Sequence, residues 1–384
     1  MADHHPKQKA KQSKASLIVL ITLALLLMIG TGILIIRLPE DEAFQLPEES
    51  GGNGSESLAG FTCDASEAPF LYPYKDKVIR LAADRISCLD LSGHERYSVD
   101  IEMEAPFVEK NGSWLMVADQ KGPDYVMLSE SGEVYRGSLD GPIVGLAVHS
   151  DGTAALIQDQ KDRTGIVSVL EAQTGRLLFD CYFPESGYVL SVAFSPDNSG
   201  FDVNLLNTDG PEPYPIIKRF ALTGEQLGQR LPDLFDLYPQ ILYDPEGNLV
   251  LAGSSGLAAL TYDQDTLLWH HSYACVHGVS SNELGTWVLA QKGQHEPVSL
   301  FLVDHKGNEK HIMDIGDRVI GPALCSRYLA VSTGSRVLII DGSSGTLIRE
   351  ESFPADIIRL DFQGEDNLII VTANAVRRLP VQES

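Results

Sequence analysis

GIVSVLEAQTGRLLFD, residues 165–180, is typical of two β-strands joined by a tight turn. Apolar positions alternate through 166–170 and 176–179, and the turn at 173–175 ends in Gly175, which can adopt a positive φ angle. The stretch therefore predicts a β-hairpin.

The same hairpin signature recurs along the chain. Further turns are expected at Gly93, Gly132, Gly224, Gly307 and Gly345, with a glycine-free copy near Asp265. From Gly93 to Gly132 is 39 residues, and from Gly132 to Gly175 is 43. A period of about 40 residues built only from strands is the spacing of propeller blades. The sequence therefore predicts an all-β propeller in which each blade has four strands, a to d, and these turns join c to d.

A second family of turns is expected to join strands a and b. These turns lie at residues 110–112, 150–152, 195–198, 244–248, 282–285 and 364–367. They are rich in Asp, Asn, Pro and Gly, which favour turns for backbone reasons. Continuous apolar segments such as 154–157 and 368–371 follow them, as suits strands covered on both faces. No helical periodicity of useful length follows residue 37, so helices should be few.

The number of blades decides how the ring closes. Seven complete units can be written, at residues 70–103, 106–140, 142–183, 188–231, 238–275, 277–315 and 319–353. An eighth unit, 356–381, ends where its outer strand belongs. Residues 57–65 (SLAGFTCDA) are expected to pair beside 375–381 and complete an eight-bladed ring, which leaves no long sheet edge open. A seven-bladed ring with a loose tail is the alternative.

The N-terminal region divides into a basic tail (1–16), an apolar run (17–36) and an acidic Gly- and Ser-containing linker (37–57), ahead of the propeller at 58–384. The 20 uncharged residues of the run would span ~30 Å as a helix, the thickness of a hydrocarbon core. A cleaved signal peptide would have a shorter apolar region and a small-residue cleavage site. We therefore expect a single-pass transmembrane anchor. The basic tail would be cytoplasmic, the linker disordered and the propeller extracellular.

The charge of the chain is strongly acidic. Of its 29 basic and 53 acidic residues, the first 37 residues hold five and one, which leaves 24 and 52 in the remainder, a net of −28. Such a surface repels phosphate backbones, so nucleic acid is not an expected partner. A basic partner would be attracted to it, and the alternative is that the acidity only keeps a large β-protein soluble.

No catalytic, cofactor-binding or metal-binding residue is predicted. The five cysteines are scattered without a close pair, and four of them fall in strand patterns. His270 and His271, with His277 nearby, form the densest histidine group, but adjacent residues on a strand point to opposite faces and cannot easily share a metal. There is no GxSxG, HExxH, calcium-loop or phosphate-loop motif.

The Thr-Gly turns resemble the quinoprotein-like (PQQ-like) propeller repeat, and the a–b turns look like those of WD40-type and YVTN-type repeats. The resemblance covers about 70–381, and the layout looks like uncharacterised membrane-anchored propellers of Gram-positive bacteria. Quinone-dependent enzymes of that group usually have Trp at the end of the motif and often an adjacent Cys pair. Here the corresponding residues are Phe179, Gln229, Trp269 and Arg349, and no cysteines are adjacent, so no cofactor is expected.

These features favour a non-catalytic binding or scaffold platform outside the membrane, with a protein, peptide or cell-wall ligand. A degenerate quinoprotein-like dehydrogenase, or a hydrolase with its site in the central funnel, is the alternative. A sensor ectodomain that signals through a partner is a third possibility.

Overall fold

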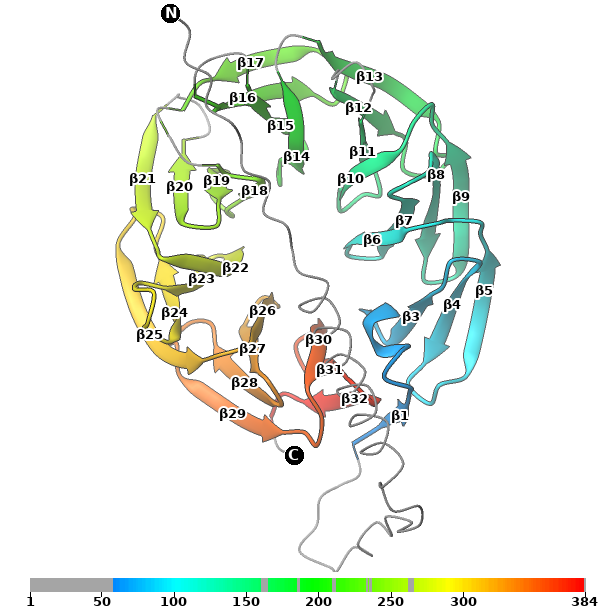
Figure 1. Ribbon diagram of the computed structural model, residues 1–384, viewed down its shortest axis with the longest axis vertical. Coiled ribbons are helices and arrows are strands. Elements are labelled where there is room, and N and C mark those ends of the chain that lie inside the picture. The colour runs from blue at the N-terminus through cyan, green and yellow to red at the C-terminus, as the bar shows by residue number, and fades with distance from the viewer. Residues whose placement is uncertain are drawn as a thin grey trace, which may run out of the picture. The chain divides into compact units, whose positions relative to one another are not determined.

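The computed structural model describes residues 58–382, except 160–164, 185–186, 209–211, 233, 235–236 and 262–265. In these residues, eight antiparallel sheets of four strands each stand in a ring (Figure 1). The eight-bladed propeller is confirmed, and the seven-bladed alternative is excluded. One 3-10 turn, η1 (Ala68–Phe70), is the only helix among the described residues.

In the first seven blades the strands run from innermost to outermost in chain order, and in the eighth the outermost strand is β1. The first blade comprises β2 (Leu71–Tyr74), β3 (Lys77–Leu81), β4 (Arg85–Asp90) and β5 (Glu95–Asp100), and the second comprises β6 (Pro106–Asn111), β7 (Trp114–Asp119), β8 (Asp124–Ser129) and β9 (Gly132–Ser138). The third comprises β10 (Ile143–Val148), β11 (Ala154–Asp159), β12 (Gly165–Leu170) and β13 (Leu177–Phe183), and the fourth comprises β14 (Tyr188–Phe194), β15 (Gly200–Asn207), β16 (Tyr214–Ala221) and β17 (Gln226–Arg230). The last four comprise β18 (Gln240–Tyr243), β19 (Leu249–Ala252), β20 (Gly256–Leu260), β21 (Leu267–Ser272); β22 (Cys275–Asn282), β23 (Gly285–Gln291), β24 (Val298–Val303), β25 (Glu309–Gly316); β26 (Val319–Leu324), β27 (Tyr328–Thr333), β28 (Arg336–Asp341), β29 (Leu347–Ser352); and β30 (Ile357–Gln363), β31 (Asn367–Thr372), β32 (Ala375–Pro380), with β1 (Gly60–Thr62) outermost.

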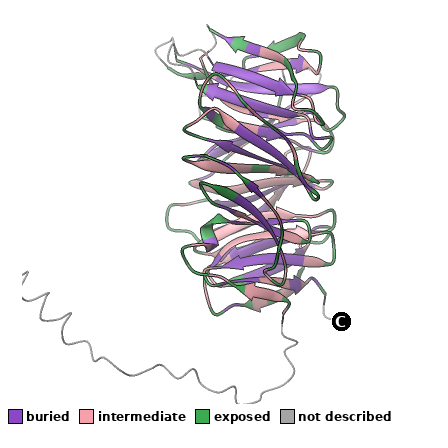
Figure 2. Cartoon of the chain, turned by 90° about the vertical axis from the view of Figure 1, so that its right-hand side faces the viewer, coloured by how far each residue is buried: buried purple, intermediate pink, exposed green. Residues whose placement is uncertain are grey.

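The hairpin predicted at 165–180 is formed by β12 and β13. All six residues of β12 are buried, because a middle strand is covered by both neighbouring blades. The Gly175 amide closes the turn by donating to the Glu171 carbonyl at 3.0 Å. Figure 2 shows the same distribution for the whole ring, with buried residues along the strands and exposed residues in the turns at both faces. The predicted turn near Asp265 lies outside the described residues.

The ring closes through its first strand, as the sequence predicts. β1 pairs antiparallel with β32, and its three residues stand opposite Arg377, Val376 and Ala375. The Arg377 side chain also donates to the Phe61 carbonyl at 3.1 Å. The eighth sheet is therefore built from both ends of the described chain, although β1 is shorter than the segment 57–65 proposed for it.

Neighbouring blades are joined where the c–d turn of one meets the outer strand of the blade before it. Gly175, at φ +65°, lies against Tyr135 of β9, so close that an added Cβ would stand 2.7 Å from the ring Cγ and 2.8 Å from Cε2. Only glycine satisfies both the backbone angle and this contact. The same arrangement pairs Gly93 with Phe61, Gly132 with Tyr97, Gly224 with Phe179, Gly307 with Trp269 and Gly345 with Ile312. Phe179 and Trp269 stand at the positions that were compared with the Trp of quinoprotein-like repeats. Both residues therefore have a packing role between blades.

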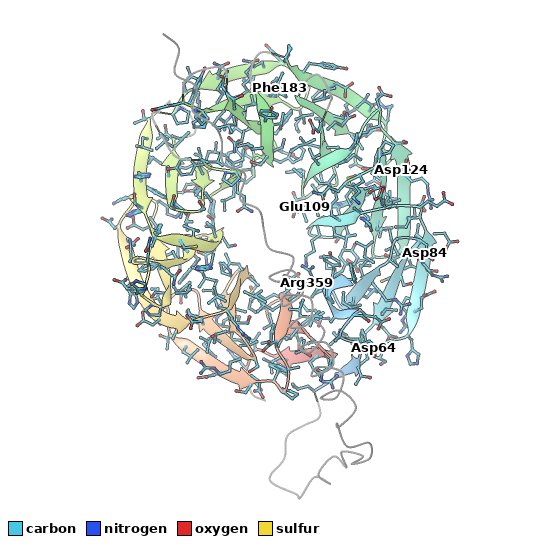
Figure 3. All side chains as sticks on the ribbon, viewed as in Figure 1. Asp64, Asp84, Glu109, Asp124, Phe183 and Arg359 are labelled. Atoms are coloured by element: carbon cyan, nitrogen blue, oxygen red, sulfur yellow. The ribbon has the colours of Figure 1, made fainter. Side chains whose placement is uncertain are left out.

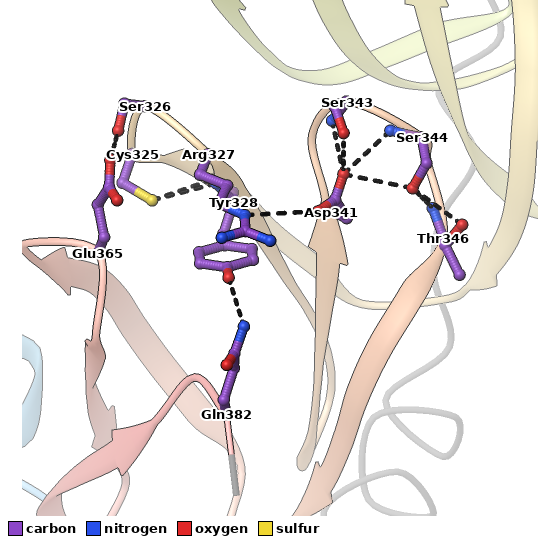
Figure 4. Close-up of polar contacts among 10 residues, drawn as sticks. All are labelled: Cys325, Ser326, Arg327, Tyr328, Asp341, Ser343, Ser344, Thr346, Glu365 and Gln382. Atoms are coloured by element: carbon purple, nitrogen blue, oxygen red, sulfur yellow. Dashed lines mark hydrogen bonds and ion pairs between the residues drawn. The ribbon is translucent and has the colours of Figure 1, made fainter.

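The seventh and eighth blades are also joined by polar contacts (Figure 4). The Gln382 amide donates to the Tyr328 hydroxyl at 2.7 Å, and the Ser326 hydroxyl bonds to the Glu365 carboxylate. Asp341 orders its own turn by accepting the backbone amides of the two serines that follow it, at 2.9 and 3.0 Å. These contacts fasten the last described residues to the blade beside them.

The cysteines and one blade boundary differ slightly from the sequence-based expectation. All five cysteines are free, but three lie in strands where four were expected, because Cys63 and Cys325 fall just beyond β1 and β26. The fifth blade ends at Ser272, and Cys275 begins the sixth.

Among the described residues no helix is long and apolar enough to cross a membrane. The tail 1–16, the run 17–36 and the linker 37–57 all lie outside the described residues.

Candidate functional site

A cavity of about 630 Å³ lies where the innermost strands of five consecutive blades converge. Its walls come from β6, β10, β14, β18 and β22, and it opens at the end of the ring that carries the a–b turns. Apolar side chains, including the buried Val148, Val192 and Ile241, line part of the wall, and polar groups make up the larger share of its exposed surface. The volume of this cavity falls within the range of about 300–1,000 Å³ that is usual for ligand sites.

Glu109 of β6 projects toward this cavity, while its neighbour Lys110 turns the other way. Successive side chains of a strand point to opposite faces. Lys110 accordingly reaches past the first blade, donates to the Pro73 carbonyl at 2.7 Å and forms an ion pair with Asp361 of the eighth blade. Figure 3 places Glu109 beside the central opening of the ring. The cation nearest to Glu109 in sequence is therefore already engaged elsewhere.

The electrostatic environment of Glu109 is unusual for a carboxylate. Glu109 is exposed on the cavity wall, yet protein atoms crowd around its carboxylate. The resulting desolvation raises the pKa of Glu109 to about 7, although the charge of Lys110 acts in the opposite direction. Among the described residues Glu109 is the one carboxylate that lines the cavity, and no lysine or arginine lines it. Within that same part of the chain, Glu109 forms no hydrogen bond or ion pair.

The other polar groups around the cavity are held by the protein. The Asn111 amide donates to the Val148 carbonyl at 3.0 Å. His149, which is buried, has Nδ1 3.0 Å from an Asp151 carboxylate oxygen, and its ring lies 5.4 Å from that of Phe194. These contacts fix the shape of the cavity mouth and leave Glu109 as the distinctive charge inside it.

A buried charged cluster supports the cavity wall behind Tyr243. The Tyr243 hydroxyl donates to the fully buried Asp202 carboxylate at 2.6 Å, and Arg219 donates to both oxygens of Asp202 at 3.1 and 2.9 Å. Burial and the Asp202 charge both raise the pKa of Tyr243, so its hydroxyl keeps its proton. Such a two-pronged pair fixes orientation strongly. The cluster therefore ties β15 and β16 of the fourth blade to β18 of the fifth.

Two further cavities, of about 570 and 800 Å³, lie at the opposite ends of the strands, around residues 82–84 and 100–103. Among the described residues, the arginines that line these cavities are in ion pairs, whereas Asp84, Asp100, Glu102 and Asp124 are not. Arg80 lies 3.7 Å from Glu67, and Arg85 lies 2.7 Å from Glu95.

The three histidines singled out in the sequence have separate partners and environments. His270 is exposed and bonds to the Tyr238 hydroxyl at 3.1 Å, whereas His271 is half-buried and bonds to the Gly307 carbonyl at 2.9 Å. His277 is exposed on the following blade. Among the described residues no three His, Cys, Asp or Glu side chains are grouped so that they could hold a metal ion.

Sequence reasoning did not single out Glu109, Asp202 or Tyr243. The signal that could have found Glu109 was its position in the blade. It stands two residues before Asn111 at the a–b turn, where the innermost strands otherwise carry mostly apolar residues. Aligning the blades on that turn would have shown an acidic residue facing the channel.

A family model matches residues 55–380, nearly the whole of the described ring. The chain belongs to a family of unknown function (DUF5711). None of the curated proteins compared with the sequence matches it.

Solved structures of other propellers are similar to this one. BamB from Moraxella catarrhalis is 13% identical with a TM-score of 0.53, and the match covers 82% of this chain and 98% of BamB. Sqt1 from Chaetomium thermophilum, bound to the N-terminus of the ribosomal protein L10, is 12% identical with a TM-score of 0.57, covering 84% and 99%. The dihydro-heme d1 dehydrogenase NirN is 12% identical with a TM-score of 0.54, covering 80% and 76%. At these identities the likeness shows the fold alone, because one fold carries many functions.

Proposed function

We propose that this protein is a non-catalytic binding platform, anchored in the cell membrane, whose propeller holds a segment of a protein or peptide partner outside the cytoplasm. The observation that carries the proposal is the channel cavity. It combines about 630 Å³ of concave space, walled by polar groups and by apolar side chains of the inner strands, with one carboxylate, Glu109, that forms no ion pair with a described residue. Concave sites on a rigid support are a common place for recognition.

The comparisons are compatible with this function. Sqt1 has the same fold and was solved with the N-terminus of another protein bound to it. A propeller of this type can therefore hold a short polypeptide segment, and the same mode is proposed for this chain.

The anchor belongs to the proposal and rests on the sequence. The uncharged run 17–36 would cross the bilayer once, with the basic tail 1–16 in the cytoplasm and the linker 37–57 as a spacer. In intact cells an external protease would then remove the propeller and leave a short N-terminal fragment in the membrane. Protection of the propeller from the protease would contradict this orientation.

The partner would carry a basic surface. The net charge of −28 after residue 37 favours the approach of cations and makes association depend on ionic strength. We expect binding to weaken steeply between low and physiological salt. Nucleic acid, which is an anion, is not proposed as a partner.

Site-specific photocrosslinking in intact membranes tests the proposal. A photoreactive residue at Gln240, which is exposed and lines the cavity from β18, should capture the partner in a defined adduct. The matched control is Glu102, which is exposed and lines the cavity at the other end of the strands. An adduct at Gln240 alone supports the channel site. Equal capture at both positions, or capture at Glu102 alone, would refute it.

A further inference from the structure

We propose, taking the binding function above as the starting point, that the channel cavity selects a lysine or arginine side chain of the partner segment, with Glu109 as the group that pairs with the cation. The stem of that side chain and its apolar neighbours would lie along the inner strands. Glu109 is thus assigned as the specificity residue of the site.

The first step is the placement of charge. Alternation along β6 sends Lys110 to Asp361, on the far side of the first blade, and sends Glu109 into the cavity. Glu109 is exposed within the cavity and has no ion-pair partner among the described residues. It can therefore pair with a cation from outside, because no lysine or arginine among the described cavity-lining residues occupies it.

The second step is the shape and composition of the walls. Val148, Val192, Ile241 and Val279 come from four different blades and line the same cavity as Glu109. This space is several times larger than an ammonium group needs. Its apolar patches suit the stem of a long basic side chain whose charged end reaches a partner, and its polar groups suit the backbone of the adjoining residues. A free small amine would leave most of the wall uncovered.

The third step concerns pH. Burial raises the pKa of Glu109 to about 7, so the carboxylate is largely protonated at pH 5.5 and ionised at pH 8. The titratable and charged groups around it are Lys110 on its own strand, His149 after β10 and Tyr243 on β18, and each has a partner in the protein. The cation preference should therefore strengthen as pH rises through about 7.

Two blocked peptides test the assignment on the purified full-length chain. Acetyl-Leu-Lys-Leu-amide and acetyl-Leu-norleucine-Leu-amide differ chiefly in the ammonium group, and hexylamine serves as the free-amine probe. Binding is measured by ligand-observed NMR at pH 8 and pH 5.5. We expect the lysine peptide to bind about tenfold more tightly than the norleucine peptide at pH 8. At pH 5.5 the two should be nearly equal, and hexylamine should bind more weakly than the lysine peptide at both values.

Variants separate the roles of the residues. Glu109→Gln should remove the preference and its pH dependence, which excludes His149 as the source, whereas Glu102→Gln at the opposite end should keep both. Gln240→Trp, at an exposed position, should obstruct the cavity and weaken both peptides.

The outcomes distinguish this inference from the function on which it rests. If both peptides bind equally and Gln240→Trp weakens both, the cavity is a peptide site but the cation selection is wrong. If Gln240→Trp changes neither, the channel site itself is wrong. A preference that persists in Glu109→Gln, or hexylamine binding as tightly as the lysine peptide, would also overturn the assignment.

Discussion

Alanine in place of Gly175 should destabilise the propeller far more than alanine in place of Gly364, although the two glycines have nearly the same backbone angle. Their φ values are +65° and +62°. The space around them differs. A Cβ at Gly175 would overlap the Tyr135 ring, while a Cβ at Gly364 would meet nothing within 4 Å. The pair therefore separates the effect of backbone strain from that of docking between blades.

The expected magnitudes follow from these two effects. A left-handed residue other than glycine costs about 1–2 kcal/mol, and both variants share that loss. Forcing a methyl group into a packed contact adds about 1–3 kcal/mol, which applies to Gly175→Ala alone. The free energy of unfolding should thus fall by about 2–5 kcal/mol for Gly175→Ala and by about 1–2 kcal/mol for Gly364→Ala.

Equilibrium unfolding in urea, followed by tryptophan fluorescence, measures both values. The same substitution in a Tyr135→Ala background provides the control, because removing the ring removes the overlap. In that background Gly175→Ala should cost no more than Gly364→Ala does in the wild-type chain. Equal losses for the two glycines in the wild-type chain would refute docking as the reason for the glycine repeat.

Three further predictions concern closure, the site and pH. Phe61→Ala should lower the free energy of unfolding by about 2 kcal/mol in the same urea experiment, since a half-buried ring is lost from the closing strand; an unchanged midpoint would argue against closure through β1. Tyr243→Phe should cost about 1–3 kcal/mol, because Asp202 stays buried with one donor fewer, and Leu242→Ala provides a comparison without that effect. Burial raises the pKa of Glu109 to about 7, above the value of about 4.3 for an unfolded Glu, so the folded state binds the extra proton and stability should fall as pH rises from about 4.3 to 7. Glu109→Gln should lack that fall when unfolding is compared at pH 5 and pH 8, and a parallel pH profile for variant and wild type would contradict the reasoning.

Much of the fold could be predicted because its signals are local and repeated. A turn such as the one at Gly175 depends on a few neighbouring residues, and its recurrence reveals the blade period. Closure could be inferred as well, since an unfinished eighth blade and an unused strand at 57–65 complement each other. The membrane anchor at 17–36 stays a prediction.

The site could not be predicted in the same way, because it depends on register. A shift of one residue turns every side chain of a strand to the other face. The innermost strands carry such shifts, between Ile143 and Gly145 in β10 and between Val189 and Ser191 in β14. Turn chemistry does not reveal where they fall. The pairing of Lys110 with Asp361, 251 residues away, is likewise beyond any local pattern.

The closing strand imposes an order of events on biogenesis. β1 is among the first segments of the ring to leave the ribosome, and its partner β32 is among the last. Gly60 can therefore pair with Arg377 only after nearly the whole ring has been synthesised. Until β1 and β32 pair, their edges can form hydrogen bonds with a strand of another chain, which makes unfinished chains prone to aggregate. A stalled or truncated product lacking β32 would keep β1 unpaired, and cells would have reason to shield it with a chaperone or to degrade it.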